Sequence, residues 1–315
     1  MLVKEERDSD IEDLINRSYR LFEIGEFSDA KSLLDEAYAL DFENAEVRSA
    51  LRACGFWTER MRKLDALGDD GTRGDYLRRQ WKHFTDRYAK GFEHPLQEGT
   101  ARLKKCVLGR ALEYYSERAG SGNDPEILLR AGRCHKALGR YEDCISAFER
   151  ALVDEGRTNP RLLAELADAY ALIGESRAAK VLMREAMFLD SGGIDLSEIE
   201  SPLFRRLIER VGTVEDPESP GFPEWLPVYG TIWGVLDVSR ELNPVEYGKL
   251  KQAIYALKSE MADGDGQGCL APRLINHYFR LIDHYRSAGM DRTAVDEALI
   301  EIKLLSPSIH RDYFG

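Results

Sequence analysis

The side chains most able to do chemistry are scattered along this sequence. The six histidines are His83, His94, His135, His277, His284 and His310. The five cysteines are Cys54, Cys106, Cys134, Cys144 and Cys269. No two cysteines have the CxxC spacing that zinc and redox sites use. An odd number of cysteines without such a framework is typical of a reducing compartment.

Two features suggest a metal site, and neither is complete. His277 and His284 lie seven residues apart on one predicted helix face, but no cysteine or carboxylate stands at a spacing that completes a ligand set. The loop from Asp263 to Gly268 resembles the first half of an EF-hand, yet Leu274 occupies the twelfth position, where calcium needs a bidentate glutamate. We therefore predict no metal site and no cofactor.

Sequence signatures of catalysis are also missing. The chain has no nucleophile elbow, Walker loop, HExxH pair or Rossmann glycine pattern. We predict that it is not an enzyme and that it acts by binding other molecules. Small-ligand binding near Trp225 and Trp233 is a third hypothesis, but no cluster of polar residues accompanies these two rings.

Charge is distributed unevenly along the chain. The net charge of −12 argues against a general nucleic-acid binder. The segment 73–118 is nevertheless basic, with 11 Lys and Arg against 6 Asp and Glu, and its interleaved aromatic rings suggest a platform for an acidic partner or RNA. Leu77, Trp81, Phe84 and Tyr88 recur there at helical spacing, which favours a core stripe flanked by solvated cations.

The N-terminal residues and the hydropathy pattern bear on location. The first eight residues contain no apolar signal core, and no run of about 18 apolar residues occurs anywhere. We expect a cytoplasmic protein without a membrane span. An exported or lipid-anchored protein is the alternative if a leader has been removed.

The elements that must position these residues are helices. Asp124-Pro125, Asn159-Pro160 and Asn243-Pro244 each place a capping side chain before a proline, which is the preferred start of a helix. Glu246 adds the second half of a capping box after Asn243. No proline falls within the segments of helical apolar periodicity. We predict an all-α protein.

Three glycines are followed by the same series of residues, which indicates an internal repeat. A small residue stands five positions after each glycine and a large apolar one stands nine positions after it: Ala30 and Leu34 after Gly25, Cys144 and Phe148 after Gly139, and Ala179 and Met183 after Gly174. Glycine turns the chain between two antiparallel helices, and the small residue lets the second helix approach the first closely.

The helices that precede these glycines complete a pattern. Leu128, Ala131, Gly132 and His135 come before Gly139, and Leu163, Leu166, Ala167 and Tyr170 come before Gly174. These residues resemble the tetratricopeptide repeat pattern W-x₂-L-G-x₂-Y…A-x₃-F, with leucine in place of tryptophan. The resemblance covers 11–44, 125–158 and 160–193. It extends weakly to 272–307, where Glu301 replaces a small residue.

The resemblance implies an α-α superhelix of helix hairpins with additional off-pattern helices. In tetratricopeptide proteins, the first helices of the hairpins line a concave groove that holds a protein or peptide segment. The residues that would form this groove here are Arg130, Arg133, Lys136, Glu165 and Asp168. Ordinary surface ion pairs explain these charges equally well. The family's clamp for C-terminal carboxylates lacks its asparagines, because the matching residues are Leu129, Arg133, Ala164 and Asp168.

The predicted domain organisation has three parts. A helical repeat array occupies 1–212, a proline-rich linker 213–227, and a C-terminal helical unit 228–315. The predicted function is a non-enzymatic scaffold for a protein or peptide partner. The alternative is a structural subunit of a homo-oligomer or larger assembly, with a contact surface formed by the aromatic residues Trp233, Tyr255, Tyr278, Tyr313 and Phe314.

Overall fold

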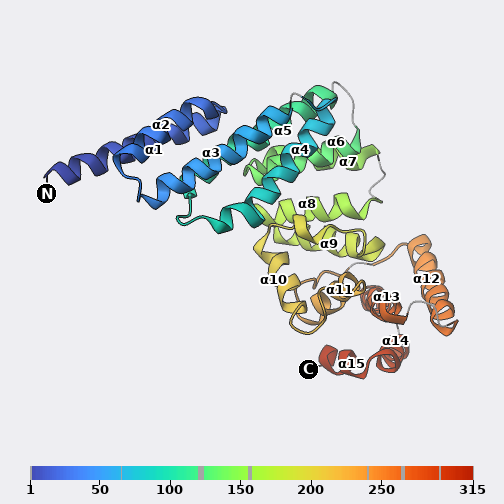
Figure 1. Cartoon of the computed structure of the whole chain (residues 1–315). Helices are drawn as coiled ribbons and strands as arrows, with labels where there is room; N and C mark the ends of the chain where they lie inside the picture. The colour runs from blue at the N-terminus through green and yellow to red at the C-terminus, as the bar shows by residue number, and fades with distance from the viewer. Residues whose placement is uncertain are drawn as a thin grey trace. The chain divides into compact units, whose positions relative to one another are not determined.

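The chain forms two compact units, Met1–Ala147 (unit 1) and Phe148–Gly315 (unit 2). The computed structural model describes residues 2–64, 66–119, 124–154, 158–239, 241–263, 267–290 and 292–314. Within these ranges the regular elements are all helices (Figure 1). The predicted all-α class is confirmed.

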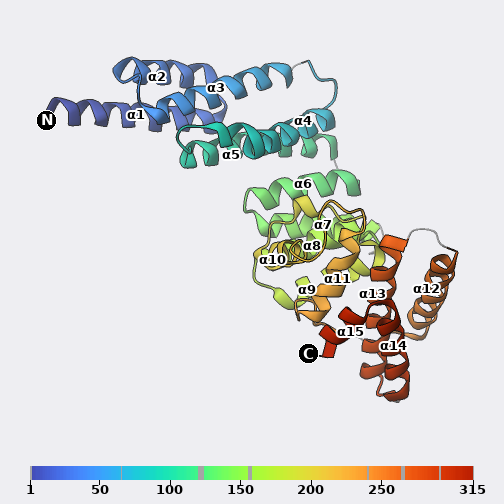
Figure 2. The same cartoon turned by 60° about the horizontal axis from the view of Figure 1, so that its bottom comes forward.

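Unit 1 is built from α1 to α6 and the first half of α7. The helices are α1 (Leu2–Ile24), α2 (Phe27–Leu40), α3 (Ala45–Leu64), α4 (Asp70–His83), α5 (Gln97–Ala119), α6 (Pro125–Ala137) and α7 (Tyr141–Asp154). A π-helical turn (Phe84–Tyr88) and a 3-10 turn (Ala89–Gly91) follow α4. The helix α2 packs against α1 and α3, α5 packs against α4 and α6, and α1 also lies against α5 (Figure 2). Their shared core is rich in rings, including Tyr19, Phe22, Trp57, Phe84 and Tyr115.

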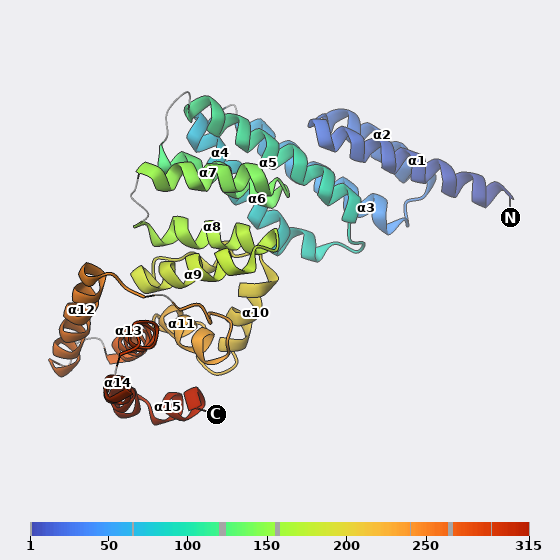
Figure 3. The same ribbon diagram turned by 180° about the vertical axis from the view of Figure 1, so that it is seen from behind.

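Unit 2 continues from the second half of α7. Its helices are α8 (Pro160–Leu172), α9 (Ser176–Asp190), α10 (Pro202–Val211), α11 (Phe222–Ile232), α12 (Pro244–Ala262), α13 (Gln267–Ser287), α14 (Arg292–Leu305) and α15 (Pro307–Phe314). A 3-10 turn (Leu196–Glu198) lies between α9 and α10. The helices α8 and α9 form a close hairpin (Figure 3), and α13 contacts α11, α12 and α14. The core around α13 contains Ile275, Phe279 and Ile282.

The three glycines that were predicted to turn the chain do so, and Gly289 turns it in the weaker match at 272–307. Gly25, Gly139, Gly174 and Gly289 have φ values of 84°, 74°, 86° and 63°, in the left-handed region where residues with a Cβ are strained. At each turn the glycine amide donates to the carbonyl three residues back, and the next amide donates to the carbonyl five residues back. These paired bonds are the Schellman motif, which satisfies carbonyls at a helix end.

The small residues after these glycines lie at the helix contacts. The side chains of Ala30, Cys144 and Ala179 are fully buried, as predicted for close approach of two helices. The large residues four positions further on, Leu34, Phe148 and Met183, are buried as well. The last hairpin differs because Glu301 stays partly exposed and forms an ion pair with Lys258 of α12 at 2.8 Å.

The predicted helix starts are also confirmed. Asp124, Asn159 and Asn243 each accept hydrogen bonds from two amides of the first turn, through a side-chain oxygen. The Glu246 carboxylate accepts a hydrogen bond from the Asn243 amide at 2.9 Å, which completes the capping box. Each cap precedes a proline at the first helical position, where the missing N–H removes no helical bond.

The structure places the predicted linker within one compact unit, and it corrects the expectation that no proline falls within a helix. The stretch 213–227 lies inside unit 2, and the division between the compact units falls at Ala147/Phe148. Part of the stretch forms the first half of α11, whose Leu226 is buried. Pro227 and Pro272 each occupy the sixth position of a helix. A proline so near the start removes a single intrahelical hydrogen bond, which packing on neighbouring helices offsets.

Candidate functional site

The cations of the predicted groove lie on α6 and interact within the protein. Arg130 forms ion pairs with Asp75 of α4 at 3.0 Å and with Glu126 at 3.2 Å. Asp75 also accepts a hydrogen bond from the Tyr115 hydroxyl at 2.8 Å, so these residues link α4, α5 and α6. Arg133 and Lys136 are buried.

The acidic residues of the predicted groove lie on α8 and are buried too. Asp168 has no exposed surface, and its two carboxylate oxygens accept hydrogen bonds from the amides of Glu200 and Ser201, each at 2.9 Å. Ser201 occupies the N-cap position of α10, so Asp168 stabilises the start of that helix although it lies 33 residues earlier in the chain. Glu165 is buried on the same helix. Partner binding by these residues remains a prediction, and Asp168 has a structural role in addition.

The basic aromatic segment contributes its rings to the core of unit 1. Leu77 and Phe84 are fully buried, and Trp81 and Tyr88 are partly buried against the same cluster. The stripe at helical spacing is therefore a core stripe, as predicted.

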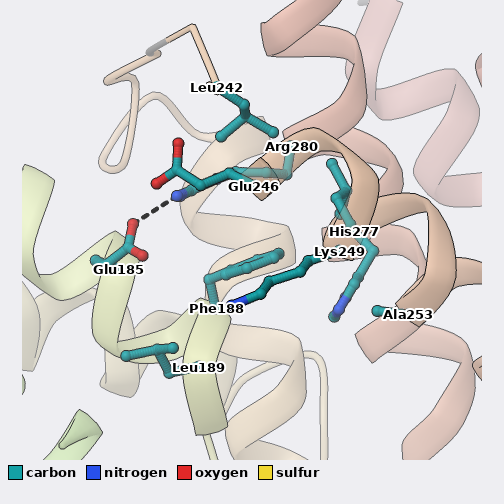
Figure 4. Close-up of a pocket in the computed structure, with 10 residues that line it drawn as sticks. Glu185, Phe188, Leu189, Leu242, Glu246, Lys249, Ala253, His277 and Arg280 are labelled. Carbon is teal, nitrogen blue, oxygen red and sulfur yellow. Dashed lines mark hydrogen bonds and ion pairs between the residues drawn. The ribbon is translucent and has the colours of Figure 1, made fainter. Parts of the chain in front are cut away.

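A half-enclosed pocket of about 290 Å³ opens between three helices of unit 2 (Figure 4). One wall is α9, the opposite wall is α12, and α13 lies at the back. Most of the lining is apolar and comes from Phe188, Leu189, Leu242, Leu250 and Ala253. A second hollow of about 280 Å³ adjoins it and shares Phe188, Leu189, Ala253 and His277.

The Phe188 ring contacts two polar side chains of α13. Its centroid is 4.9 Å from that of the His277 ring, and the Arg280 guanidinium lies over it at 4.5 Å. A cation over an aromatic face is attracted by the ring quadrupole. These contacts hold α9 against α13 and fix the apolar surface at the back of the pocket.

The acidic side chains around the pocket are already engaged. Glu185 accepts a hydrogen bond from Arg280 at 2.5 Å, drawn as a dashed line in Figure 4. In the adjoining hollow, Glu224 of α11 pairs with Arg273. Glu224 is buried, and a buried carboxylate is costly unless it is paired, so the packing requires its ion pair. Glu185 is partly exposed, and its ion pair with Arg280 joins α9 to α13.

His277 exposes one ring nitrogen towards the pocket. Its Nδ1 lies 2.8 Å from the Arg273 carbonyl oxygen, which can only accept, so Nδ1 carries the proton. Burial lowers the pKa of His277, and the charges of Arg273 and Arg280 lower it further. The imidazole is therefore neutral near pH 7, and its Nε2 is a hydrogen-bond acceptor at the pocket.

Lys249 is the cation of the pocket that makes no hydrogen bond or ion pair with the described residues. It is exposed on α12, and its side chain extends across the pocket towards Phe188 (Figure 4). Glu246, one turn earlier, is used in the capping box of α12. The arrangement suits an apolar group that also carries a hydrogen-bond donor and an anion.

The protonation state of His277 gives a testable pH dependence. An ordinary imidazole protonates near pH 6.5, and the pKa of buried His277 lies lower. In the interval between these values the unfolded chain binds more protons than the folded one. The contribution of His277 to the free energy of unfolding of unit 2 is therefore expected to fall as pH falls below about 6.5, by up to about 1.4 kcal/mol per pH unit.

Denaturant unfolding at about pH 7.5 and about pH 5.5 measures this loss of stability. His277→Gln, which keeps a polar side chain without a titrating group, should show a smaller difference between the two pH values. A variant as pH-dependent as the parent protein would show that His277 does not carry the effect.

The other residues singled out from the sequence lie outside this pocket. Trp233 packs under the Arg210 guanidinium at 3.9 Å, and Tyr313 stacks on Phe279. Tyr278 is buried, whereas Tyr255 is 78% exposed on α12. Of the loop 263–268, residues 264–266 lie outside the described ranges. Among the described residues no three His, Cys, Asp or Glu side chains are grouped to hold a metal ion.

No protein-family model matches the chain, and no curated protein matches it either. None of the described helices is both long enough and apolar enough to cross a membrane. Inference about function therefore starts from the geometry of the chain itself.

Proposed function

We propose that this chain is a non-enzymatic interaction module in which tetratricopeptide-like hairpins support a binding pocket for a partner protein or peptide. The pocket between α9, α12 and α13 receives an apolar side chain of the partner. The four hairpin turns with the Schellman motif, three of them followed by fully buried small residues, support the repeat interpretation.

One observation carries the proposal: the pocket is apolar at its walls and open to solvent, with polar groups converging on it. Its volume of about 290 Å³ lies at the lower end of the range for ligand sites, which suits a single side chain better than a large cofactor. An apolar anchor buried in such a pocket usually supplies much of the binding energy of an interface.

Filling the pocket should abolish this interaction. Ala253 is partly buried on α12 and lines both hollows, so Ala253→Trp places an indole where the partner's side chain would enter. Peptides selected from a displayed random library on the purified protein are expected to bind this variant at least about tenfold more weakly, which is about 1.4 kcal/mol.

Gln252→Trp is the matched control, because it puts the same ring on the preceding residue of α12, which is exposed and does not line the pocket. Calorimetric titration should give the parent affinity for this variant. Peptides that bind Ala253→Trp as tightly as the parent would place the binding site elsewhere on the chain.

A further inference from the structure

We infer that the partner segment bound in the pocket carries a carboxylate beside its apolar side chain, and that Lys249 recognises this carboxylate. The inference rests on the proposed function, since it names the chemistry of the group that the pocket receives. The carboxylate belongs to an Asp or Glu next to the anchor residue of the partner.

The pairing of charges around the pocket leads to this conclusion. Arg280 and Arg273 are neutralised by Glu185 and Glu224, so neither guanidinium is left to attract an anion. Lys249 has no such partner among the described residues, although Glu246 lies three positions earlier on the same helix. Its ammonium is thus available at the mouth of an apolar pocket.

The position of Lys249 makes it a selective contact. Its side chain extends over the pocket from α12 towards Phe188 of α9, so its stem covers apolar surface while the ammonium stays in water (Figure 4). An anion attached to a group inside the pocket meets this ammonium directly. A cation attached to the same group would meet it with repulsion.

His277 supplies the second polar contact. Its Nε2 accepts a hydrogen bond, because Nδ1 donates to the Arg273 carbonyl. A backbone N–H of the partner provides the matching donor. The pocket therefore combines an apolar cavity, an acceptor and a cation, which are the complements of a side chain, an amide and a carboxylate.

The size of the carboxylate contribution is modest. An exposed ion pair typically contributes under about 1 kcal/mol, which corresponds to about a fivefold change in affinity. The net charge of −12 repels an acidic partner at long range, but this repulsion is screened beyond about 8 Å at physiological salt. The preference is therefore set by contact with Lys249.

Three small probes test the inference: 3-phenylpropionate, its neutral amide 3-phenylpropanamide, and the cation 2-phenylethylamine. All three carry the same ring on a two-carbon stem. Methyl NMR titrations of the full chain, followed at Leu189, Leu242 and Leu250, give their affinities. We expect the carboxylate to bind about three- to fivefold more tightly than the amide, and the amine most weakly.

Lys249→Glu should reverse the order of the carboxylate and the amine. Lys251→Glu is the control, because Lys251 is exposed on the same helix and does not line the pocket. Equal affinities of the three probes, lost together in Ala253→Trp, would overturn the carboxylate inference and leave the pocket in place. If none of the probes perturbs the pocket methyl groups, the proposed pocket fails as well.

Discussion

Asp168→Ala is expected to destabilise unit 2 by about 3 kcal/mol, which lowers its melting temperature by about 6–12 °C. Asp168 is completely buried, and both of its oxygens accept backbone N–H bonds. Hydrogen bonds to a charged group are among the stronger ones in proteins. Alanine leaves the amides of Glu200 and Ser201 without this acceptor, and Ser201 is buried, where an unsatisfied donor is costly.

The loss of stability in Asp168→Ala originates at the start of α10. Ser201 is the N-cap of α10, but its own side chain makes no capping bond. Asp168 takes the position that a glutamate of the same helix occupies in a capping box, because it accepts the N-cap amide. Removing it should loosen the start of α10 before the rest of unit 2 unfolds, which amide hydrogen exchange would detect.

Two variants calibrate this prediction. Asp168→Asn keeps one acceptor oxygen and should lose about half as much stability. Glu175→Ala removes an exposed carboxylate at the start of α9 that makes no capping bond, and it should change stability by under about 0.5 kcal/mol. If Asp168→Ala unfolds at the same denaturant concentration as Glu175→Ala, the capping role is refuted.

Asp168 also shows where prediction from sequence ends. Its place on the first helix of a hairpin follows from local spacing, and α8 lies where that spacing put it. The amides that it holds belong to a segment 32 and 33 residues further along the chain. That contact depends on the path taken after α9, which no periodicity within one helix specifies.

The hairpin turns were predictable because their cause is local. A glycine with positive φ, a Schellman motif and a small residue five positions later all lie within one stretch of sequence, as at Gly174 and Ala179. The mismatch at Glu301 was also visible in the sequence. The ion pair of Glu301 with Lys258 explains this mismatch. It could not be predicted, because no repeat pattern covers α12 or gives its position.

The pocket was not predictable for the same physical reason. Phe188, Lys249 and His277 come from three helices and are about thirty or more residues apart along the chain, so only tertiary packing brings them together. The sequence did contain one indication of the pocket. Arg273, His277 and Arg280 follow helical spacing and mark one polar face of α13, which is otherwise an apolar core helix.

Arg184→Met is expected to cost about 3–5 kcal/mol, the largest effect of a single substitution that we predict. The Arg184 guanidinium on α9 is buried and bonds both the Asp283 carboxylate of α13 and the Val238 carbonyl. Methionine preserves most of the stem and removes both bonds. It leaves the largely buried Asp283 carboxylate without its main partner, which is the costly way to break an ion pair.

The variant should also respond to pH with a defined sign. Burial already raises the pKa of Asp283, and Arg184 opposes that rise, so its removal raises the pKa further. A folded-state pKa above the unfolded value means that the folded chain binds more protons. Arg184→Met should therefore lose stability, relative to the parent, as pH rises from about 5 to about 7.

The double variant Arg184→Met/Asp283→Leu separates the cost of an unpaired charge from the loss of packing. Replacing both partners of a buried pair by apolar residues is often close to neutral, so the double variant should regain at least about 2 kcal/mol over Arg184→Met. The Val238 carbonyl still lacks its donor, which leaves a cost of about 1 kcal/mol. If the changes in unfolding free energy caused by the two single substitutions add up to that of the double variant, the two side chains are not coupled. Apolar contacts would then hold α9 and α13 together.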